Sequence, residues 1–193
     1  MNIISEMISQ RISGPIAAQL SQRLGVSEST AQTAVQLAVP VILAALARNA
    51  SKPQGAQELH QAVSTDHDGT ILDQLSSYLG NPQAANGSGI LGHVLGGQRP
   101  VVESNLAQAT GMDQNSAGNL LEMVAPLVMG AVGREQQQNG LDPNGLSEFL
   151  VQQQQAEVQS NPGLMGTLSS MLDSNRDGSV TDDLSRMAGG FFK

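Results

Sequence analysis

The sequence predicts an all-α protein in which two tandem helical repeats, each with a helix-turn-helix corner, pack into one body. The first observation is that only 2% of the 193 residues are aromatic, which leaves the core to Ala, Val, Leu, Ile and Met. Strands normally draw on aromatic as well as β-branched residues. The second observation is that apolar residues recur at helical spacing in the most apolar segments. The third is an internal repeat, the usual sign of a repeated supersecondary unit.

The repeat aligns residues 24–49 with residues 110–135 without a gap, at an offset of 86. Identical residues stand at matching positions: Gly25 and Gly111, Ala31 and Ala117, Pro40 and Pro126, Ala45 and Ala131, Arg48 and Arg134. Ser27 corresponds to Asp113, and both are good helix N-caps. Chance likeness between Ala- and Gly-rich helices is the alternative, and the paired glycines, caps, prolines and arginines argue against it.

The likeness continues downstream with small shifts. Its later members are 55–59 with 145–149, 75–79 with 168–172, and Gly96-Gly97 with Gly189-Gly190. We therefore divide the chain into a first helical unit, 1–97, and a second helical unit, 98–193, which carries an acidic loop near its C-terminal end.

The first unit contains a short amphipathic helix over 15–24, followed by Gly25 where a helix C′ residue belongs. Ser27 caps the next helix, whose apolar residues cover nearly all of its faces. Such a helix belongs in the middle of a fold, so residues 35–46 and their copy at 120–132 are expected to form the shared core. Pro40 must kink this helix or split it in two, and the same holds for Pro126.

Two further helices follow at about 55–64 and 69–79. A Gly-rich segment then runs from 86 to 97. In the second unit, 136–139 and 152–155 are polar and low in complexity, and we expect them to be exposed helix ends or loops.

Segment 16–35 has the residue order of a helix-turn-helix, with Gly25 in the turn, Val26 packed inward and Ser27 as the cap. A recognition helix offers basic or amide side chains to base edges, supported by phosphate contacts. The second helix offers these side chains: Glu28, Ser29, Gln32, Thr33 and Gln36. It has no cation in its first three turns, and 9 Lys and Arg against 17 Asp and Glu give a net charge of −8. Because nucleic-acid affinity depends on basic residues, we favour a tight helical corner over a DNA-reading element.

Residues 173–180 match the first eight positions of a Ca²⁺-binding loop. The candidate oxygen ligands are Asp173, Asn175, Asp177, Ser179, Thr181, Asp182 and Asp183. Gly178 permits the sharp turn, and Ca²⁺ takes six to eight such oxygens. Leu184 replaces the bidentate Glu of the twelfth position, so Asp183 or Asp182 would close the site from the next helix. The alternative is a plain loop in which Thr181 caps that helix.

A fainter version of this loop lies in the first unit, at 64–75. It keeps Asp66, Asp68, Gly69 and Asp73 but has Ser64 at the first position. Metal binding is a weaker hypothesis here than in the C-terminal loop, because short motif matches require structural support.

Other catalytic and binding motifs are absent from the sequence. There is no Cys, and therefore no thiolate nucleophile, disulfide or Cys-based zinc site. The histidines, His60, His67 and His93, lack helical ligand spacing, and we expect them to be solvated or to cap helices. The Gly-rich stretch at 86–93 follows no strand and precedes no P-loop Lys, so it is not a phosphate loop.

The start of the chain has no basic region and no unbroken apolar run, so no secretory signal is visible. The longest apolar stretches, 38–47 and 124–132, are shorter than the ~20 residues that span a bilayer. We therefore expect a cytoplasmic protein without a membrane partner.

Three motifs resemble a known family: the stretches at 66–73 and 89–97, and the Asp-Gly-Ser-Val-Thr-Asp-Asp-Leu run at 177–184. Together with the helical unit they are similar to bacterial domain-of-unknown-function family nine-three-seven, the YidB-like proteins. The resemblance implies an all-helical, homeodomain-like fold in a bacterial cytoplasmic protein. It implies no established activity and no catalytic residues. Relative to the more acidic final loop of the family, Asn175 would weaken cation binding.

The sequence favours a non-enzymatic structural or interaction protein, with Ca²⁺ holding the C-terminal loop. Protein partners or self-association are expected, and nucleic acid is not. The alternative is a DNA-binding regulator, which requires a basic surface beside Arg11, Arg23 and Arg99. The third hypothesis is an enzyme with a site between the units, but the sequence contains no nucleophile–base pair that would form such a site.

Overall fold

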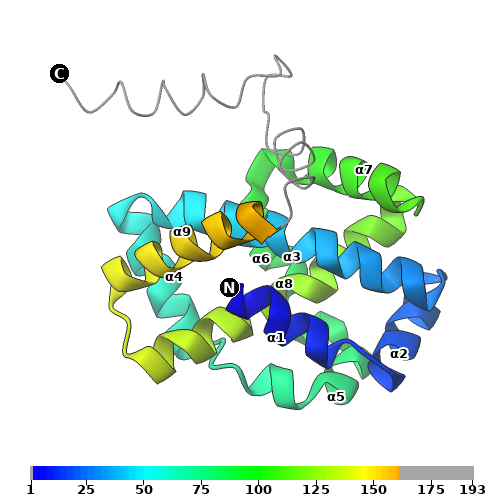
Figure 1. Cartoon of the computed structure of the whole chain (residues 1–193), viewed down its shortest axis with the longest axis horizontal. Helices are drawn as coiled ribbons and strands as arrows, with labels where there is room; N and C mark the ends of the chain where they lie inside the picture. The colour runs from blue at the N-terminus through cyan, green and yellow to red at the C-terminus, as the bar shows by residue number, and fades with distance from the viewer. Residues whose placement is uncertain (1, 161–193) are drawn as a thin grey trace.

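The computed structural model describes residues 2–160, and this part of the chain is all-helical, as predicted (Figure 1). The helices in chain order are α1 (Ile3–Arg11), α2 (Pro15–Leu24), α3 (Glu28–Ala50), α4 (Pro53–Thr65), α5 (Leu75–Gly80), α6 (Gly87–Leu95), α7 (Arg99–Thr110), α8 (Gln114–Asn139) and α9 (Pro143–Ser160). Three 3₁₀ turns separate some of them: η1 (Thr70–Asp73), η2 (Pro82–Ala85) and η3 (Gly96–Gln98). No strand occurs within residues 2–160.

The two longest helices, α3 and α8, pack against each other in the middle of the molecule. Every residue of 38–47 in α3 and of 123–133 in α8 is buried. The prediction that these segments form the shared core is confirmed, since one contiguous hydrophobic cluster contains both. Helices buried on all faces gain their stability from packing rather than from an amphipathic stripe.

Both central helices continue through their prolines, so neither helix is split. Each proline lacks an N–H and leaves the carbonyl four residues earlier without its helical donor. These carbonyls belong to Gln36 in α3 and Glu122 in α8. An interior proline costs roughly 3 kcal/mol, which the packing on every side of each helix offsets.

The corners between α2 and α3 and between α7 and α8 have the same local geometry. Gly25 and Gly111 adopt left-handed conformations, with φ of 67° and 72°, at the ends of α2 and α7. Ser27 accepts a hydrogen bond from the N–H of Thr30, and Asp113 accepts one from the N–H of Ser116. The predicted C′ glycine and N-caps are therefore confirmed.

The helix that follows each central helix packs against the other central helix. Helix α4 lies on α8, α9 lies on α3, and α4 and α9 also contact each other (Figure 1). The two sequence units thus contribute to one interleaved core. The boundary at 97/98 stays a prediction.

The Gly-rich segment, for which the sequence predicted no secondary structure, forms helix α6, and Gly87 lets that helix lie against the Glu122 carbonyl of α8. Two local predictions were wrong. The helix expected over 69–79 is broken into η1 and α5 at Gln74. Gln136 and Gln153, expected to be exposed, are buried and hydrogen-bonded. Gln153 accepts from the Ile3 N–H at 2.9 Å, and Gln136 donates to the Leu141 carbonyl at 3.1 Å.

By length and composition, α3 and α8 could each cross a membrane. In the fold, 72% and 83% of their most apolar windows are buried inside the molecule. The core helix of a soluble protein passes the same test, so this finding is weak evidence for a membrane span.

Candidate functional site

The loop at 66–73, one of the segments singled out in the sequence, lies on the surface of α8 between α4 and α5. It approaches α8 closely because that helix carries glycine where the loop passes. A Cβ atom on Gly133 would lie 1.8 Å from the His67 carbonyl oxygen, and one on Gly130 would lie 2.6 Å from the Ile71 side chain. Only glycine at these two positions permits the contact.

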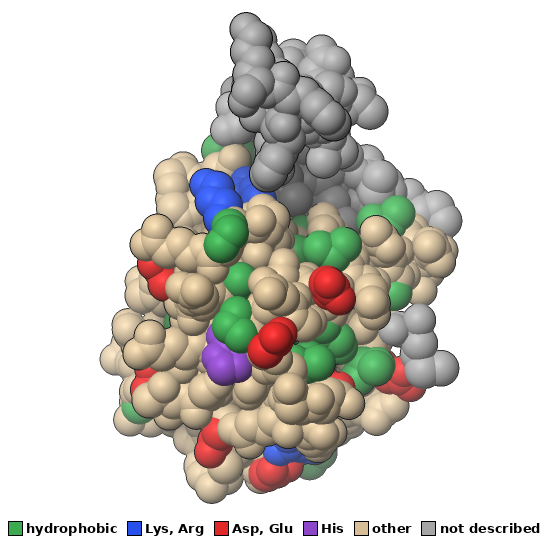
Figure 2. All heavy atoms as spheres, turned by 90° about the vertical axis from the view of Figure 1, so that its left-hand side faces the viewer, with side chains coloured by type: hydrophobic (Ala, Val, Ile, Leu, Met, Phe, Trp, Pro, Cys, Tyr) green, Lys and Arg blue, Asp and Glu red, His purple; other side chains and the backbone are tan. Residues whose placement is uncertain are grey.

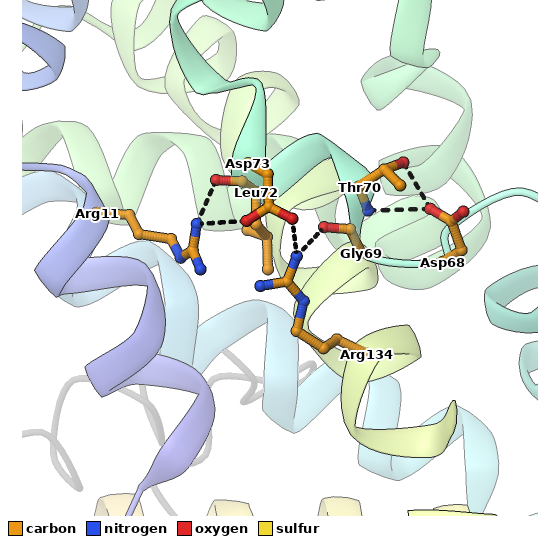
Figure 3. A network of polar contacts seen from close by, with 7 residues as sticks. All are labelled: Arg11, Asp68, Gly69, Thr70, Leu72, Asp73 and Arg134. Carbon is orange, nitrogen blue, oxygen red and sulfur yellow. Dashed lines mark hydrogen bonds and ion pairs between the residues drawn. The ribbon is translucent and has the colours of Figure 1, made fainter. Parts of the chain in front are cut away.

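Two arginines hold the end of this loop, and we call Arg11, Arg134 and Asp73 the arginine clasp (Figure 3). Arg134 on α8 donates to the Gly69 carbonyl at 2.8 Å and to the Asp73 carboxylate at 2.5 Å. Arg11 on α1 donates to the Leu72 carbonyl at 2.6 Å and to Asp73 at 3.0 Å. The hydrogen bonds from Arg134 and then Arg11 hold the pKa of Asp73 below its ordinary value.

Asp68 closes the other end of the loop. Its carboxylate accepts hydrogen bonds from the Thr70 N–H at 2.9 Å and from the Thr70 hydroxyl at 2.6 Å. These bonds, the hydroxyl's first, lower the pKa of Asp68. Gly69, which lies between Asp68 and Thr70, has φ of 91°, a backbone conformation that residues other than glycine rarely adopt.

The loop is therefore organised by arginines and local hydrogen bonds. Asp68 and Asp73 lie at its opposite ends and have different partners (Figure 3). No group of three or more His, Asp or Glu side chains suited to a metal ion occurs in the part of the chain that the structure describes. The weaker metal hypothesis for 64–75 gains no support from this geometry.

The stronger metal hypothesis concerns residues outside the described range. These are the C-terminal candidates Asp173, Asn175, Asp177, Ser179, Thr181, Asp182 and Asp183. Ca²⁺ binding by this loop therefore stays a prediction.

A second feature adjoins the loop: a pocket of about 220 Å³ between α4 and α6, here called the α4–α6 pocket. Its apolar lining comes from four helices and consists of Leu46, Leu59, Ala62, Ile90, Val94 and Met129. Its polar members are Asn49, Glu58, His67 and His93. Figure 2 views the α4 side of the molecule and shows a histidine and acidic side chains beside hydrophobic ones.

The polar groups of this pocket have distinct environments. Asn49 donates to the Val94 carbonyl at 3.1 Å and joins α3 to α6. Glu58 and His93 lie at the rim, 3.7 Å apart, and both are largely exposed. Burial lowers the pKa of His67, against the opposing effect of the Asp66 and Asp68 carboxylates. A neutral imidazole therefore lines the pocket at neutral pH.

Sequence reasoning missed this pocket, because its residues come from separate parts of the chain. His67 and His93 line it together, while His60 instead lies 3.0 Å from the Leu141 carbonyl. The sequence did contain one indication of the pocket. Ile90 and Val94 are apolar residues four positions apart, the spacing of one helix face, and His93 lies beside them in the segment that we described only as Gly-rich.

No curated protein and no solved structure matches this chain. The family model described as "Bacterial protein of unknown function (DUF937)" matches residues 6–135. That span contains the arginine clasp, the loop at 66–73 and every residue that lines the α4–α6 pocket. With two thirds of its length matched, the chain belongs to the DUF937 family of bacterial proteins of unknown function.

Proposed function

We propose that this protein is a non-enzymatic interaction module that binds a partner protein at the α4–α6 pocket. The observation that carries the proposal is the apolar lining of that pocket, with its few polar groups at defined places. Pockets of this kind bury apolar groups and use a small number of polar groups for orientation. A pocket of about 220 Å³ has room for an aliphatic or aromatic side chain of the partner.

The charge at the rim indicates the chemistry of the partner. Glu58 is exposed beside the pocket, so a Lys or Arg next to the inserted apolar side chain would find a carboxylate. Among the residues that the structure describes, the lining contains no hydroxyl, thiol or amine side chain that could act as a nucleophile next to His67 or His93. This supports binding rather than covalent catalysis as the role of the pocket.

The pocket can be tested with toluene as an apolar probe and with ¹³C-methyl methionine spectra of the full chain. Met129 lines the pocket, whereas buried Met112 lies outside its lining and is the internal control. We expect toluene to shift the Met129 methyl signal and leave Met112 unchanged, and Ile90→Asp to abolish the shift. An unchanged Met129 signal at saturating toluene would reject the pocket as a binding site.

The partner itself can be sought by capture from a bacterial extract with three versions of the full chain. Wild type and a matched surface variant, Val151→Asp, are expected to retain the same proteins, because Val151 is exposed on α9. Ile90→Asp is expected to lose them while keeping its helical circular dichroism. Proteins that bind all three versions equally do not use this pocket and would contradict the proposal.

For the alternative, a DNA-binding regulator, the arrangement of the basic residues is unfavourable. Arg11 pairs with Asp73, and Arg99 pairs with Glu103 at 2.7 Å and with Glu122 at 2.5 Å. Arg23 donates to the Gly80 carbonyl at 2.6 Å. Because Arg11 and Arg99 are paired with carboxylates, we expect no salt-dependent binding of duplex DNA in a fluorescence anisotropy titration.

Three finer features complete the proposal. We infer that the two units are copies of one homeodomain-like helical unit, which is supported by the matching corners at Gly25 and Gly111. We propose Ca²⁺ binding by the C-terminal loop, which is supported by its sequence pattern alone. A cytoplasmic location and self-association are also proposed, and they too are supported by the sequence alone.

A further inference from the structure

A second pocket, here called the α8 pocket, has a volume of about 430 Å³ and opens to solvent beside the central helix α8. Its walls come from the end of α2, from η2, from the start of α6 and from α8. Its lining is mostly polar and includes a guanidinium and a carboxylate, those of Arg23 and Glu122. It shares no lining residue with the α4–α6 pocket. The α8 pocket is therefore a separate candidate site, suited to a different ligand chemistry.

Arg23 supplies this pocket with a positive charge that is held in place but not paired. Its guanidinium donates to the carbonyl of Gly80, the last residue of α5, at 2.6 Å. No Asp or Glu within residues 2–160 forms an ion pair with it. A guanidinium has further N–H groups in a planar fork that matches the two oxygens of a carboxylate. Arg23 can therefore bind a carboxylate from solution while it stays bound to Gly80.

Glu122 belongs to a cluster with an excess of negative charge. Arg99 donates to Glu122 at 2.5 Å and to Glu103 at 2.7 Å, so one guanidinium is shared by two carboxylates. Two carboxylates and one guanidinium leave the cluster with one net negative charge. The bond from Arg99 uses only one oxygen of Glu122, and this side chain is 34% exposed. Its other oxygen can therefore accept a hydrogen bond from a donor in the pocket.

The two charges line one pocket without pairing with each other. The carboxylate of Glu122 is bound by Arg99, while Arg23 is bound only by a neutral carbonyl. A ligand that carries both a carboxylate and an ammonium group would compensate both. A ligand with a single charge would leave the other side chain uncompensated, and desolvating an unpaired charge is costly.

The neutral groups of the pocket favour a small polar ligand. The hydroxyl of Ser88 accepts from Arg99 at 2.9 Å, which leaves its own O–H free to donate. The amides of Gln83 and Asn119 line the pocket and have no hydrogen-bond partner among residues 2–160. Amide groups can donate to a carboxylate and accept from an ammonium group. Of the described lining residues, only Pro82 and Met123 have apolar side chains, so there is little surface for a large apolar group.

We propose that the α8 pocket binds a small amino-acid zwitterion, whose carboxylate pairs with Arg23 and whose ammonium group pairs with Glu122. The ligand is a free small molecule with both groups a few bonds apart. This goes beyond the protein interaction proposed for the α4–α6 pocket and does not depend on it, because other residues are involved.

The test uses ¹³C-methyl methionine spectra of the full chain, because Met123 lines this pocket and Met112 lies outside its lining. The probes are the straight-chain amino acids from glycine to δ-aminovalerate, a series that varies the distance between the two charges. We expect at least one of them to shift the Met123 methyl signal and leave Met112 unchanged. The carboxylate and the amine of the same chain length should each bind at least about tenfold more weakly, since a hydrogen bond to a charged group typically contributes that much.

Variants with matched controls identify the two charged side chains. Arg23→Gln and Glu122→Gln should each weaken binding by about tenfold or more. Lys52→Gln and Glu28→Gln make the same changes of charge at exposed positions outside the lining and should bind like wild type. Helical circular dichroism checks that each variant is folded.

Two results would overturn the proposal. An unchanged Met123 signal with every amino acid of the series, at high millimolar concentration, would mean that the pocket does not take such ligands. A singly charged probe that binds as tightly as the amino acid would mean that the pocket does not require both charges. Both comparisons use the wild-type chain, so neither depends on the folding of a variant. The toluene test of the α4–α6 pocket is unaffected by either outcome.

Discussion

Asp73 joins the loop at 66–73 to two of the helices. It accepts hydrogen bonds from arginines on two helices that are remote in sequence, α1 and α8. A carboxylate shared by two guanidinium groups is favoured in its charged form. The same carboxylate belongs to the weaker metal hypothesis, and in the structure its partners are the two arginines of the clasp.

The clasp predicts a pH dependence with a definite sign. Since the folded state lowers the pKa of Asp73, its contribution to stability is fully present above the ordinary Asp value of 3.8. That contribution is lost as the pH falls below 3.8 through the lowered value. We expect Asp73→Asn to melt below wild type at pH 7, with the difference shrinking at pH 2–3. A difference that is constant across this range would show that the charge of Asp73 does not contribute.

Tyr78 carries a second prediction, because its hydroxyl is bound to the Met123 carbonyl inside the protein. Burial, and next the charge of Glu122, raise the pKa of this phenol, so it stays protonated and donates. We expect Tyr78→Phe to lower the free energy of unfolding by about 1–2 kcal/mol, the usual cost of leaving a buried acceptor unpaired. Urea denaturation followed by circular dichroism measures this, and an unchanged m-value would exclude an altered unfolded state.

The C-terminal loop gives a prediction that rests on the sequence. If Ca²⁺ occupies it, ligand at about 100 times its dissociation constant stabilises the protein by ~2.7 kcal/mol. We expect 1 mM Ca²⁺, on the order of that excess for a sensor-type loop, to raise the melting temperature by several degrees relative to chelator. Mg²⁺ should have less effect, and Asp177→Ala should abolish the rise. Equal melting temperatures under all conditions would indicate a capped turn without metal.

At the scale of the elements, glycines decide how closely helices and loops approach α8. A Cβ on Gly133 would meet the His67 carbonyl at 1.8 Å, whereas a Cβ on Gly92 of α6 would meet nothing within 4 Å. Both glycines lie in helices, so their backbone propensities are comparable and their surroundings differ. Substituting Gly133 and Gly92 by Ala therefore separates the effect of packing on stability from the effect of helix propensity.

We expect Gly133→Ala to destabilise the protein by about 1–3 kcal/mol, because the loop must move away from α8. Gly92→Ala is the matched control and should stabilise it by about 0.8–1.0 kcal/mol through helix propensity alone. Guanidinium denaturation of both variants measures whether each substitution lowers or raises the free energy of unfolding. Stabilisation by Gly133→Ala would mean that the loop does not lie on α8 as described.

At the scale of the whole molecule, the interleaving of α4 and α9 joins the two sequence units. Each central helix is covered by a helix from the other unit, so the described parts of the two units share one hydrophobic cluster. Leu43 on α3 is fully buried and Leu127 on α8 is 2% exposed, both within the single hydrophobic cluster.

This arrangement predicts one cooperative unfolding transition. Leu43→Ala and Leu127→Ala should each cost about 2–5 kcal/mol and lower the same transition temperature. In calorimetry, the ratio of calorimetric to van't Hoff enthalpy should be close to one. Two transitions, each moved by only one of the substitutions, would instead indicate two independent domains divided near residue 97.

The sequence by itself determined the all-α class, the caps at Ser27 and Asp113, the left-handed glycines and the two buried central helices. These features depend on residues within a few positions of one another, where spacing and backbone preference act directly. Tertiary structure alone decided that the Gly-rich segment folds as α6, that Gln136 and Gln153 are buried, and that His67 and His93 share a pocket. It also decided that arginines hold Asp73, one of them 61 positions away along the chain. These outcomes depend on contacts between remote segments, because the close approach of two elements, rather than local propensity, provides each partner.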